Sequence, residues 1–460
     1  MKLRICLLIS LTLLALLYQA AAQVSFTLAS SPVVGLNPSS VVAMDVYGNG
    51  KLDLIVLSAG YNGLGGPVFG TLTVLTNSGC GMFGSNATYT MPNVPWTVVA
   101  ADVNGDGKPD LICADGRNSA LSVLTNNGSG IFGSNATYTV GYGSYWVEAA
   151  DVNGDGKVDL ISANGGGTTI TVLTNNGSGI FGSNATYAVG YMPQSVVAVD
   201  VNGDGKVDLI CAFSGNPFGV TVLTNNGIGI FGSNATYTIC GRPDLVMAAD
   251  VNVDGKPDLI SVNRDDNTLT VLTNNGIGVF GSNATYTVGD NCQSVVAADV
   301  NGDGKLDLIC ANFGENGLGG NITVLTNDGS GGFVFASTLN VGMTVQAVMA
   351  ADINGDGKED LISANLSGYS GTLSVLINNT AFPPPTFPPP VAIHFQSQGM
   401  LLVSWPSASA GWSLQQNPDL TTANWGPSGY SGYGISDDGT NKSLTILPTS
   451  GNLFFRILHP

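Results

Sequence analysis

The 460-residue sequence predicts an all-β fold, a seven-bladed β-propeller followed by a small C-terminal β-sandwich-like domain. First, a unit of about fifty residues recurs seven times along the chain. Second, each unit holds four short β-branched or aromatic runs that are separated by Gly, Asn and Asp. Third, the chain has 63 Gly and only 10% charged residues, a composition that disfavours long charged helices. Four strands in each of seven units are typical of a propeller.

The first 22 residues have the features of an export signal. Lys2 and Arg4 precede an apolar run over residues 5–17, and Ala20, Ala21 and Ala22 supply small residues before a cleavage point. The apolar run is shorter than the roughly 20 residues that a membrane-spanning helix needs. We therefore expect residues 1–22 to be removed, which leaves a secreted or cell-surface protein with no integral membrane segment.

Residues 23–380 contain the repeats. In the fourth unit the apolar runs are 195–199, 208–212, 220–224 and 235–239, with an acidic loop between the first two and an Asn-Asn-Gly turn between the last two. The seventh unit has only three runs, and residues 24–28 resemble a fourth. Pairing of this N-terminal strand with the last unit would close the ring and leave no open first or last edge.

The acidic loop places Asp, Asn and Asp at positions one, three and five, and Asp at position nine, around a glycine-containing turn. Hard oxygen donors in that number suit calcium, with the backbone carbonyl of position seven as a further ligand. Three carboxylates within nine residues repel one another unless a cation offsets them, which argues against loops that serve only as solvated turns. The predicted ligands are Asp102, Asn104, Asp106, Lys108, Asp110, Asp151, Asn153, Asp155, Lys157, Asp159, Asp200, Asn202, Asp204, Lys206, Asp208, Asp250, Asn252, Asp254, Lys256, Asp258, Asp299, Asn301, Asp303, Lys305, Asp307, Asp352, Asn354, Asp356, Lys358 and Asp360.

About six calcium sites are expected, because the first loop is degenerate. It starts at Asp45 and has Tyr47 at position three and Asn49 at position five, so only two carboxylates remain. The fifth loop has Val253 at position four, where the other intact loops have Gly, but its expected ligands are complete.

Two motifs recur in step, the acidic loop and a Phe-Gly dipeptide at Phe132, Phe181, Phe231 and Phe280. With both motifs the chain resembles the FG-GAP/VCBS repeat family, to which the propellers of integrin α-subunits belong. The resemblance covers residues 24–379. It implies a seven-bladed propeller with calcium in the loops, and a role in adhesion or carbohydrate recognition.

Strands that alternate in direction sort the connections between two faces. The acidic loops and the Asn-Asn-Gly turns share one face, here called the loop face, and the connections that differ between units share the other, the variable face. Such varied loops are often the binding surface of repeat proteins. Aromatic rings beside hydrogen-bonding groups suit sugar rings, although the same aromatics could instead fill gaps where blades meet. The candidate ligand-binding residues are Trp96, Trp146, Tyr142, Tyr145, Arg117 and Arg264.

The composition disfavours two functional classes. A net charge of −18 opposes binding of nucleic acid, whose backbone is also negative. The only histidines, His394 and His459, lie beyond the repeats, so a catalytic centre is poorly supplied. We therefore expect a non-catalytic binder of glycans or extracellular proteins. The alternative is a polysaccharide lyase or a glycoside hydrolase that uses Asp115 with Asp265 or Asp266.

Six cysteines follow the predicted signal. Cys113, Cys211 and Cys310 occupy the same position in different units, and we expect them to pack as small apolar residues. Cys80, Cys240 and Cys292 lie in connecting segments, where a bridge among them is open.

The tail changes composition. Residues 381–390 are rich in proline and predict a stiff extended spacer. Residues 391–460 carry apolar runs at 400–405 and 453–458, with Trp405, Trp412 and Trp425, and predict a small β domain with an aromatic core.

Overall fold

The computed structural model of the chain describes residues 24–60, 69–91, 94–315, 317, 319–367 and 370–382, together with seven short strands between residues 392 and 458. The predicted signal at 1–22 and residues 383–390 of the predicted spacer lie outside the described residues. All regular elements of the described chain are strands, and none of its segments forms a helix long and apolar enough to cross a membrane.

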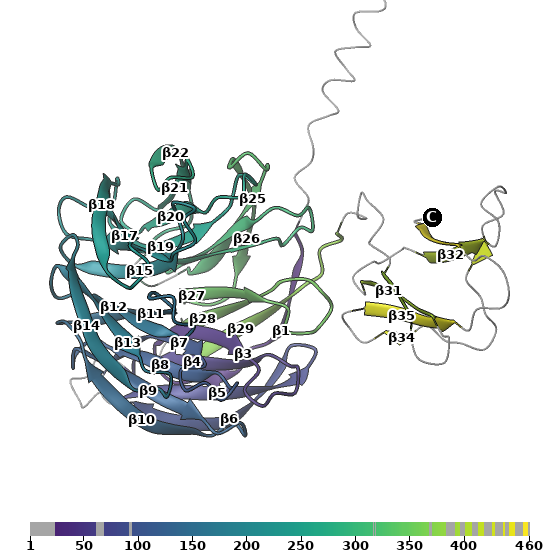
Figure 1. Cartoon of the computed structure of the whole chain (residues 1–460), viewed down its shortest axis with the longest axis horizontal. Coiled ribbons are helices and arrows are strands. Elements are labelled where there is room, and N and C mark those ends of the chain that lie inside the picture. Colours follow the sequence, from purple (N-terminus) through teal and green to yellow (C-terminus); the bar gives the residue numbers. More distant parts are fainter. Residues whose placement is uncertain are drawn as a thin grey trace, which may run out of the picture. The chain divides into compact units, whose positions relative to one another are not determined.

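Seven sheets, the blades, are arranged around a central axis (Figure 1). Blades 1 to 6 have four antiparallel strands each, and the chain passes through them from the inner strand to the outer one. In order, they are β3 (Pro38–Met44), β4 (Asp53–Ser58), β5 (Gly70–Gly79) and β6 (Met82–Met91); β7 (Pro95–Ala101), β8 (Asp110–Asp115), β9 (Ala120–Asn126) and β10 (Phe132–Thr139); β11 (Ser144–Ala150), β12 (Asp159–Asn164), β13 (Thr169–Asn175) and β14 (Phe181–Ala188); β15 (Pro193–Val199), β16 (Asp208–Phe213), β17 (Gly219–Asn225) and β18 (Phe231–Thr238); β19 (Pro243–Ala249), β20 (Asp258–Asn263), β21 (Thr268–Asn274) and β22 (Phe280–Thr287); β23 (Cys292–Ala298), β24 (Asp307–Asn312), β25 (Asn321–Asn327) and β26 (Phe333–Asn340).

Blade 7 joins the two ends of the propeller. Its inner three strands come from late in the chain, and β1 from the N-terminus pairs antiparallel with β29, Phe26 opposite Asn378 (Figure 1). The short strand β2 pairs with the same neighbour. The strands are β27 (Thr344–Ala351), β28 (Asp360–Ser367), β29 (Ser370–Asn378), β1 (Phe26–Ser30) and β2 (Val33–Val34). Seven blades and the closure by the N-terminal strand are thus confirmed.

The core lies between the blades. Both faces of each second strand are covered by neighbouring blades, and for this reason these strands are continuous apolar runs without alternation. Leu160 and Ile161 of β12, for example, are completely buried. Seven hydrophobic clusters each combine side chains of two adjacent blades, and the cluster of blades 7 and 1 completes the ring.

The phenylalanine of the Phe-Gly dipeptide also joins blades. Phe181 of blade 3 packs edge-on against Tyr138 of blade 2, with ring centroids 5.2 Å apart, and the Tyr138 hydroxyl donates to the carbonyl of Gly179 at 3.0 Å. The same Tyr–Phe pair occurs between the next blades. The recurrence of this dipeptide is therefore explained by packing between units.

A ring of buried asparagines links every blade to the preceding one. Each is the first Asn of the turn between the third and fourth strands of its blade. Its Nδ2 donates to the carbonyl of position two in the acidic loop of the preceding blade. Asn225, for instance, donates to Val152 at 2.7 Å and to Val207 of its own blade at 2.8 Å. The seven members are Asn77, Asn126, Asn175, Asn225, Asn274, Asn327 and Asn378.

One expectation about the cysteines is wrong. Cys310 does not pack as a free apolar side chain but forms a disulfide with Cys292 of the same blade. Cys292 starts β23, and the bulge that follows it brings its side chain toward Cys310 on β24. Cys113 and Cys211 are free and buried, as expected, and Cys80 and Cys240 are free and exposed.

The C-terminal unit is a separate set of strands. One sheet has the order β30-β31-β35-β34 and the other has the order β33-β32-β36. The two longest predicted apolar runs coincide with β31 and β36. The strands are β30 (Ala392–Phe395), β31 (Leu401–Pro406), β32 (Ser413–Asn417), β33 (Gly426–Pro427), β34 (Ser436–Asp437), β35 (Asn441–Ile446) and β36 (Phe454–Leu458).

Candidate functional site

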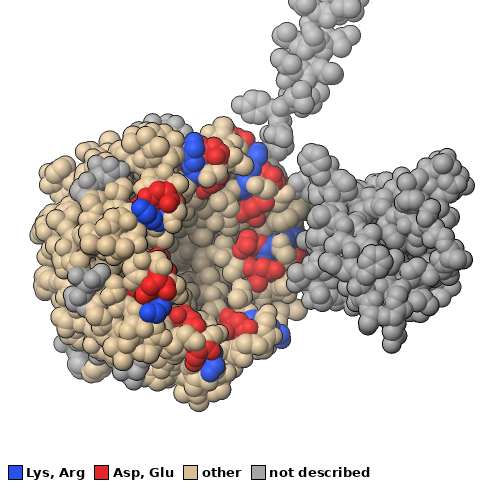
Figure 2. Space-filling view, in the orientation of Figure 1, with Lys and Arg blue, Asp and Glu red and all other residues tan. Residues whose placement is uncertain are grey.

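The acidic loops and the turns between third and fourth strands lie together, as the strand order predicts. The Nζ of Lys108 in the second loop donates to the carbonyl of Asn127 in the turn of the same blade at 3.3 Å, and Lys305 makes the same contact with Asp328. Figure 2 shows acidic side chains, most with a basic neighbour, clustered around the central hollow of the propeller. In five loops the lysine at position seven lies 3.3–3.8 Å from the aspartate at position five.

Each intact loop folds its oxygen atoms over its own backbone. The carboxylate of Asp102 accepts hydrogen bonds from the N–H groups of Gly105 and Gly107, both at 2.8 Å. The amide oxygen of Asn104 accepts from the N–H of Asp106 at 2.9 Å, and the carboxylate of Asp106 accepts from the N–H of Lys108 at 3.0 Å. The loops that start at Asp151, Asp200 and Asp299 repeat this pattern. In the fifth loop Asp250 accepts from the N–H groups of Asp254 and Gly255. Three oxygen-bearing side chains are thus held on one short turn.

The aspartate at position nine has a different environment. Asp110 is completely buried, and its two oxygens accept from the N–H groups of Val103 and Asn126. Burial raises the pKa of Asp110, the two N–H groups oppose that shift, and the charges of Asp106 and Asp102 add to it. Asp53 of the degenerate first loop makes the same two bonds, to Val46 and Asn77. This aspartate therefore connects loop and turn even in the blade whose loop lacks the acidic residue of position five.

The donor set of the intact loops fits calcium in its chemistry. The side chains of positions one, three and five are all oxygen donors, and each loop carries at least two exposed or partly exposed carboxylates, a composition that hard cations prefer. Within the described part of the chain, no group of three or more His, Cys, Asp or Glu side chains is arranged as a metal site. The buried aspartates at position nine explain why three carboxylates do not converge, because their oxygens point to backbone N–H groups instead.

The first loop adds an aromatic contact to its backbone hydrogen bonds, in which Asp45 accepts from the N–H groups of Asn49 and Gly50. Tyr47 takes the place of the position-three asparagine and is partly buried against the cluster of blades 1 and 2. It lies against Gly130 in the turn of blade 2, where a Cβ atom would come within 2.4 Å of the Tyr47 hydroxyl. The degenerate loop therefore keeps its place in the ring by packing as well as by the hydrogen bonds of Asp45 and Asp53.

Four of the six candidate ligand-binding residues meet on the variable face. Trp96, Tyr142, Tyr145 and Arg117 line one cavity of about 640 Å³, together with Asn37, Val94 and Gly116. Trp96 is 43% exposed and Tyr142 73% exposed, and the rings of Trp96 and Tyr145 are 5.7 Å apart. Gly116 permits this arrangement, because a Cβ atom there would lie 2.8 Å from the indole of Trp96. We call this cavity the aromatic pocket.

Trp146 does not join the aromatic pocket, contrary to the expectation. Successive side chains of a strand point to opposite faces, so Tyr145 faces Trp96 while Trp146 faces the other way. Its side chain is partly buried against the cluster of blades 3 and 4 and also against the cluster of blades 5 and 6. The indole therefore lies inside the ring, and its buried Nε1 has no hydrogen-bond partner.

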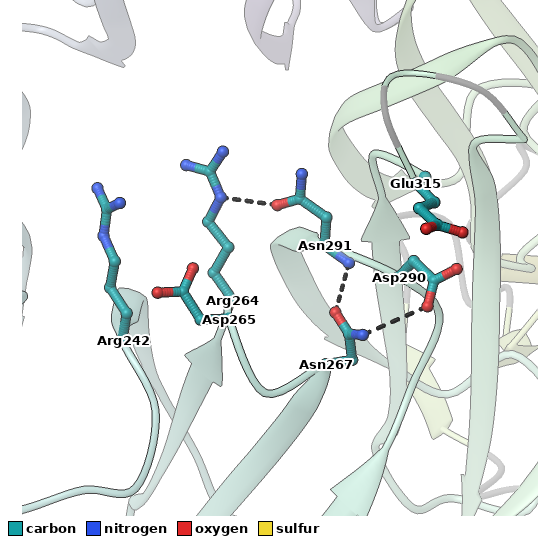
Figure 3. Close-up of a pocket in the computed structure, with 8 residues that line it drawn as sticks. Arg242, Arg264, Asp265, Asn267, Asp290, Asn291 and Glu315 are labelled. Carbon is teal, nitrogen blue, oxygen red and sulfur yellow. Dashed lines mark hydrogen bonds between the residues drawn. The ribbon is translucent and has the colours of Figure 1, made fainter.

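Arg264 lines a second cavity, of about 480 Å³, between blades 5 and 6 on the variable face (Figure 3). Its Nε donates to Asn291 at 2.6 Å and its Nη1 to Asp244 at 3.1 Å. Arg242 also lies 3.2 Å from Asp244, an ion pair without hydrogen-bond alignment. Burial raises the pKa of Asp244, and the two guanidinium groups oppose that shift. Asp265, Asp290 and Glu315 complete this charged pocket.

The carboxylates considered for a hydrolase do not meet in either cavity. Asp115 is buried and accepts from the backbone of Arg117 and from the Asn118 amide, beside the aromatic pocket. Asp265 lines the charged pocket, three blades further along the chain. The candidate ligand-binding residues Arg117 and Arg264, the basic side chains that a lyase could use, line pockets on the variable face, away from the acidic loops.

Sequence reasoning missed Glu148 of the inner strand β11. The other blades have Val or Met at this position, three residues before the acidic loop, for example Val99, Val197 and Met247. Burial raises the pKa of Glu148 to about 7, and the nearby Trp146 indole, although not in hydrogen-bonding geometry, opposes the shift. The sequence does contain a signal for Glu148, because it is the single acidic residue at a repeat position that is otherwise apolar.

Glu148→Gln should change how stability depends on pH. The folded protein holds this proton up to about pH 7, whereas the unfolded chain loses it near its ordinary pKa, so the wild type loses stability as pH rises from 5 to 8. Because the side chain is partly exposed, we expect a loss of about 2 kcal/mol that the variant lacks. Urea unfolding at both pH values measures it, and parallel pH profiles of the two proteins would contradict the assignment.

Comparison with family models places the chain. A model described as the FG-GAP-like repeat matches residues 45–113, 102–162, 151–211, 200–260, 250–310 and 300–363. Each match begins at or next to one acidic loop and extends beyond the following one. The matches together cover more than half of the sequence, and the chain belongs to the FG-GAP-like repeat family. No curated protein matches it.

Two solved structures show the same fold at low sequence identity. A crystal structure of BBS1N in complex with ARL6DN is 12% identical with a TM-score of 0.55, over 78% of this chain and 98% of that chain. A protein from Lactobacillus plantarum is 14% identical with a TM-score of 0.51, over 67% of this chain and 87% of that chain.

Proposed function

We propose that this protein is a secreted or cell-surface binding platform, stabilised by calcium, that holds a glycan or an extracellular protein on its variable face. The observation that carries the proposal is the aromatic pocket, where Trp96 and Tyr145 expose ring faces beside the guanidinium of Arg117. Aromatic faces stack on the C–H faces of sugars, while polar side chains satisfy the hydroxyl groups.

Export is supported by two features. The N-terminal segment has the composition of a cleaved signal. The disulfide between Cys292 and Cys310 belongs to the kind of bond that persists in oxidising compartments.

Calcium has a structural part in this proposal. The side chains at positions one, three and five of the six intact loops would hold the ion, with the position-seven carbonyl, and the bound cations would offset the repulsion among the loop carboxylates. Calcium would fix the loop face and would not contact a ligand on the variable face. No nucleic acid partner fits a chain of net charge −18.

Replacement of Trp96 by Ala should abolish most ligand binding without unfolding the protein. A partly exposed aromatic anchor in a pocket is commonly worth about 2 kcal/mol or more, which corresponds to roughly 30-fold in affinity. Retention of the mature protein on a panel of insoluble polysaccharides and extracellular matrix proteins, with calcium and with chelator, measures it.

The matched control is Ile228→Ala, which removes a side chain 64% exposed on the loop face. Equal retention of the Trp96→Ala variant and the wild type would reject the aromatic pocket as the site. Release of soluble sugar from the polysaccharides would instead reveal an enzyme.

A further inference from the structure

Every blade carries a β-bulge near the start of its inner strand, at the second residue in blades 1 to 6 and at the third residue of β27 in blade 7. The register between the first and second strands skips one residue there in all seven blades. These bulge residues are Ser39, Trp96, Tyr145, Gln194, Asp244, Gln293 and Gln346. A bulge leaves one residue outside the ladder and redirects its side chain, and bulges of this kind are common beside binding sites.

The bulge residues differ in character from the rest of the inner strand. Two positions further along, all seven blades have valine, for example Val98, Val147 and Val196, which pack between blades. At the bulge, by contrast, the seven side chains are all polar or aromatic, and each keeps part of its surface exposed. The repeat thus copies this core position without change, whereas the bulge position differs between blades.

Three of the bulge residues are glutamines held in a fixed orientation. The Nε2 of Gln194 donates to the carbonyl of Met192 at 3.0 Å, that of Gln293 donates to Asn291 at 2.9 Å, and that of Gln346 donates to Asn37. Their Oε1 atoms receive no hydrogen bond from the described part of the chain. Each amide therefore presents an acceptor whose direction is set before a ligand arrives, which lowers the entropy cost of binding.

The other bulge residues connect this ring to both cavities. Trp96 and Tyr145 are the stacked pair of the aromatic pocket. Asp244 makes ion pairs with both Arg242 and Arg264 of the charged pocket. Asn291, which accepts from the Gln293 amide, lines that pocket beside Arg264 (Figure 3). Bulge residues of blades 2 and 3 thus line one cavity, and those of blades 5 and 6 contact residues that line the other.

We propose that the seven bulge residues form one axial site for a neutral oligosaccharide, an inference that rests on the proposed binding function. The aromatic pair stacks on one sugar unit, and the glutamine amides accept hydrogen bonds from hydroxyl groups of others. The aromatic pair and the glutamines stand on different blades, so a ligand reaches both only by spanning the mouth of the ring. The charge of Asp244 is offset by two arginines, and the carboxylates of Asp265, Asp290 and Glu315 repel an anionic chain.

The test is binding of the mature protein to immobilised neutral hexasaccharides of glucose, mannose, xylose and N-acetylglucosamine. The variant replaces Gln194, Gln293 and Gln346 together by alanine. Loss of three hydrogen bonds should weaken binding about a hundredfold, roughly fivefold for each. The matched control replaces three exposed turn amides of the loop face, Asn127, Asn176 and Asn226, and should bind as the wild type does.

The outcomes separate this inference from the proposed function. If the glutamine variant binds fully while Trp96→Ala does not, the ligand is confined to the aromatic pocket and the axial site is rejected, although the platform stands. If the wild type binds none of the neutral hexasaccharides, the axial site is likewise rejected, and binding of a protein or a charged glycan would still support the platform. A triple Gln→Met variant, which keeps side-chain length without hydrogen bonding, replaces the alanine variant if the latter unfolds.

Discussion

Removal of calcium is expected to lower the thermal unfolding midpoint of the propeller by about 20 °C. An ion that binds only the folded state adds about 2.7 kcal/mol per site when its concentration is a hundred times its Kd, and six such sites add about 16 kcal/mol. Unfolding of about 350 residues has an entropy of roughly 0.7 kcal/mol/K, which converts this energy into the stated shift. Calorimetry with calcium and with chelator measures it.

The loop residues provide the control for the calcium effect. Asp204→Asn removes one exposed carboxylate of the fourth loop but keeps an oxygen in place, so its thermal shift on chelation should shrink by about one sixth. The first loop supplies an internal contrast, because Asp45 has no acidic partner at position five. A midpoint that is the same in calcium and in chelator would show that the loops are held by their backbone hydrogen bonds alone.

Asn225→Ala is expected to lower the free energy of unfolding by about 3 kcal/mol, a large effect for one side chain. The Nδ2 of this residue, which is 5% exposed, bridges the carbonyl groups of Val152 and Val207. Alanine leaves two buried carbonyls without partners, each at a cost of about 1–3 kcal/mol, and opens one link of the asparagine ring. Urea unfolding with fluorescence detection measures the change.

The neighbouring Asn226 is the matched control. It is exposed, and its side chain accepts only from N–H groups of its own turn, at Ile228 and Ile230. Asn226→Ala should therefore cost less than about 1 kcal/mol. Similar losses for the two variants would mean that the turn itself, and not the link between blades, makes the first asparagine important.

The repeat made the architecture predictable. Every run that was predicted to form a strand does so, because β-branched residues and turn residues act locally. The closure of the ring was predictable as well, because residues 24–28 are a single run and the seventh unit has only three. The sharing of one face by acidic loops and turns followed from strand direction alone. The gathering of Trp96, Tyr142 and Tyr145 was foreseen for the same reason, because all three lie just before or at the start of an inner strand.

Other features depend on contacts that no local pattern encodes. The aspartate at position nine is predicted from the sequence to be a metal ligand, yet Asp53 keeps the same backbone contacts in a loop whose ligand set is incomplete. The disulfide between Cys292 and Cys310 was not predicted, because Cys310 occupies the same repeat position as cysteines of other blades and was grouped with them. The bulges were not predicted, because polar or aromatic residues at one position do not by themselves show that the strand register skips a residue there. This skip separates Tyr145 from Trp146.

The pairing of β1 with β29 has a consequence for the order in which the molecule assembles. The residues that meet here are far apart in the sequence. Asn379, for example, donates a hydrogen bond to Thr27, 352 positions earlier in the chain. At about 5–20 residues per second, synthesis of the intervening chain takes roughly 20–70 s, and throughout that time the first strand has no partner. Six blades are complete before the seventh can close, so the nascent protein is an open arc with two bare strand edges. Passage across a membrane before the last blade is made would keep this arc extended, and closure would then become the final event on the far side.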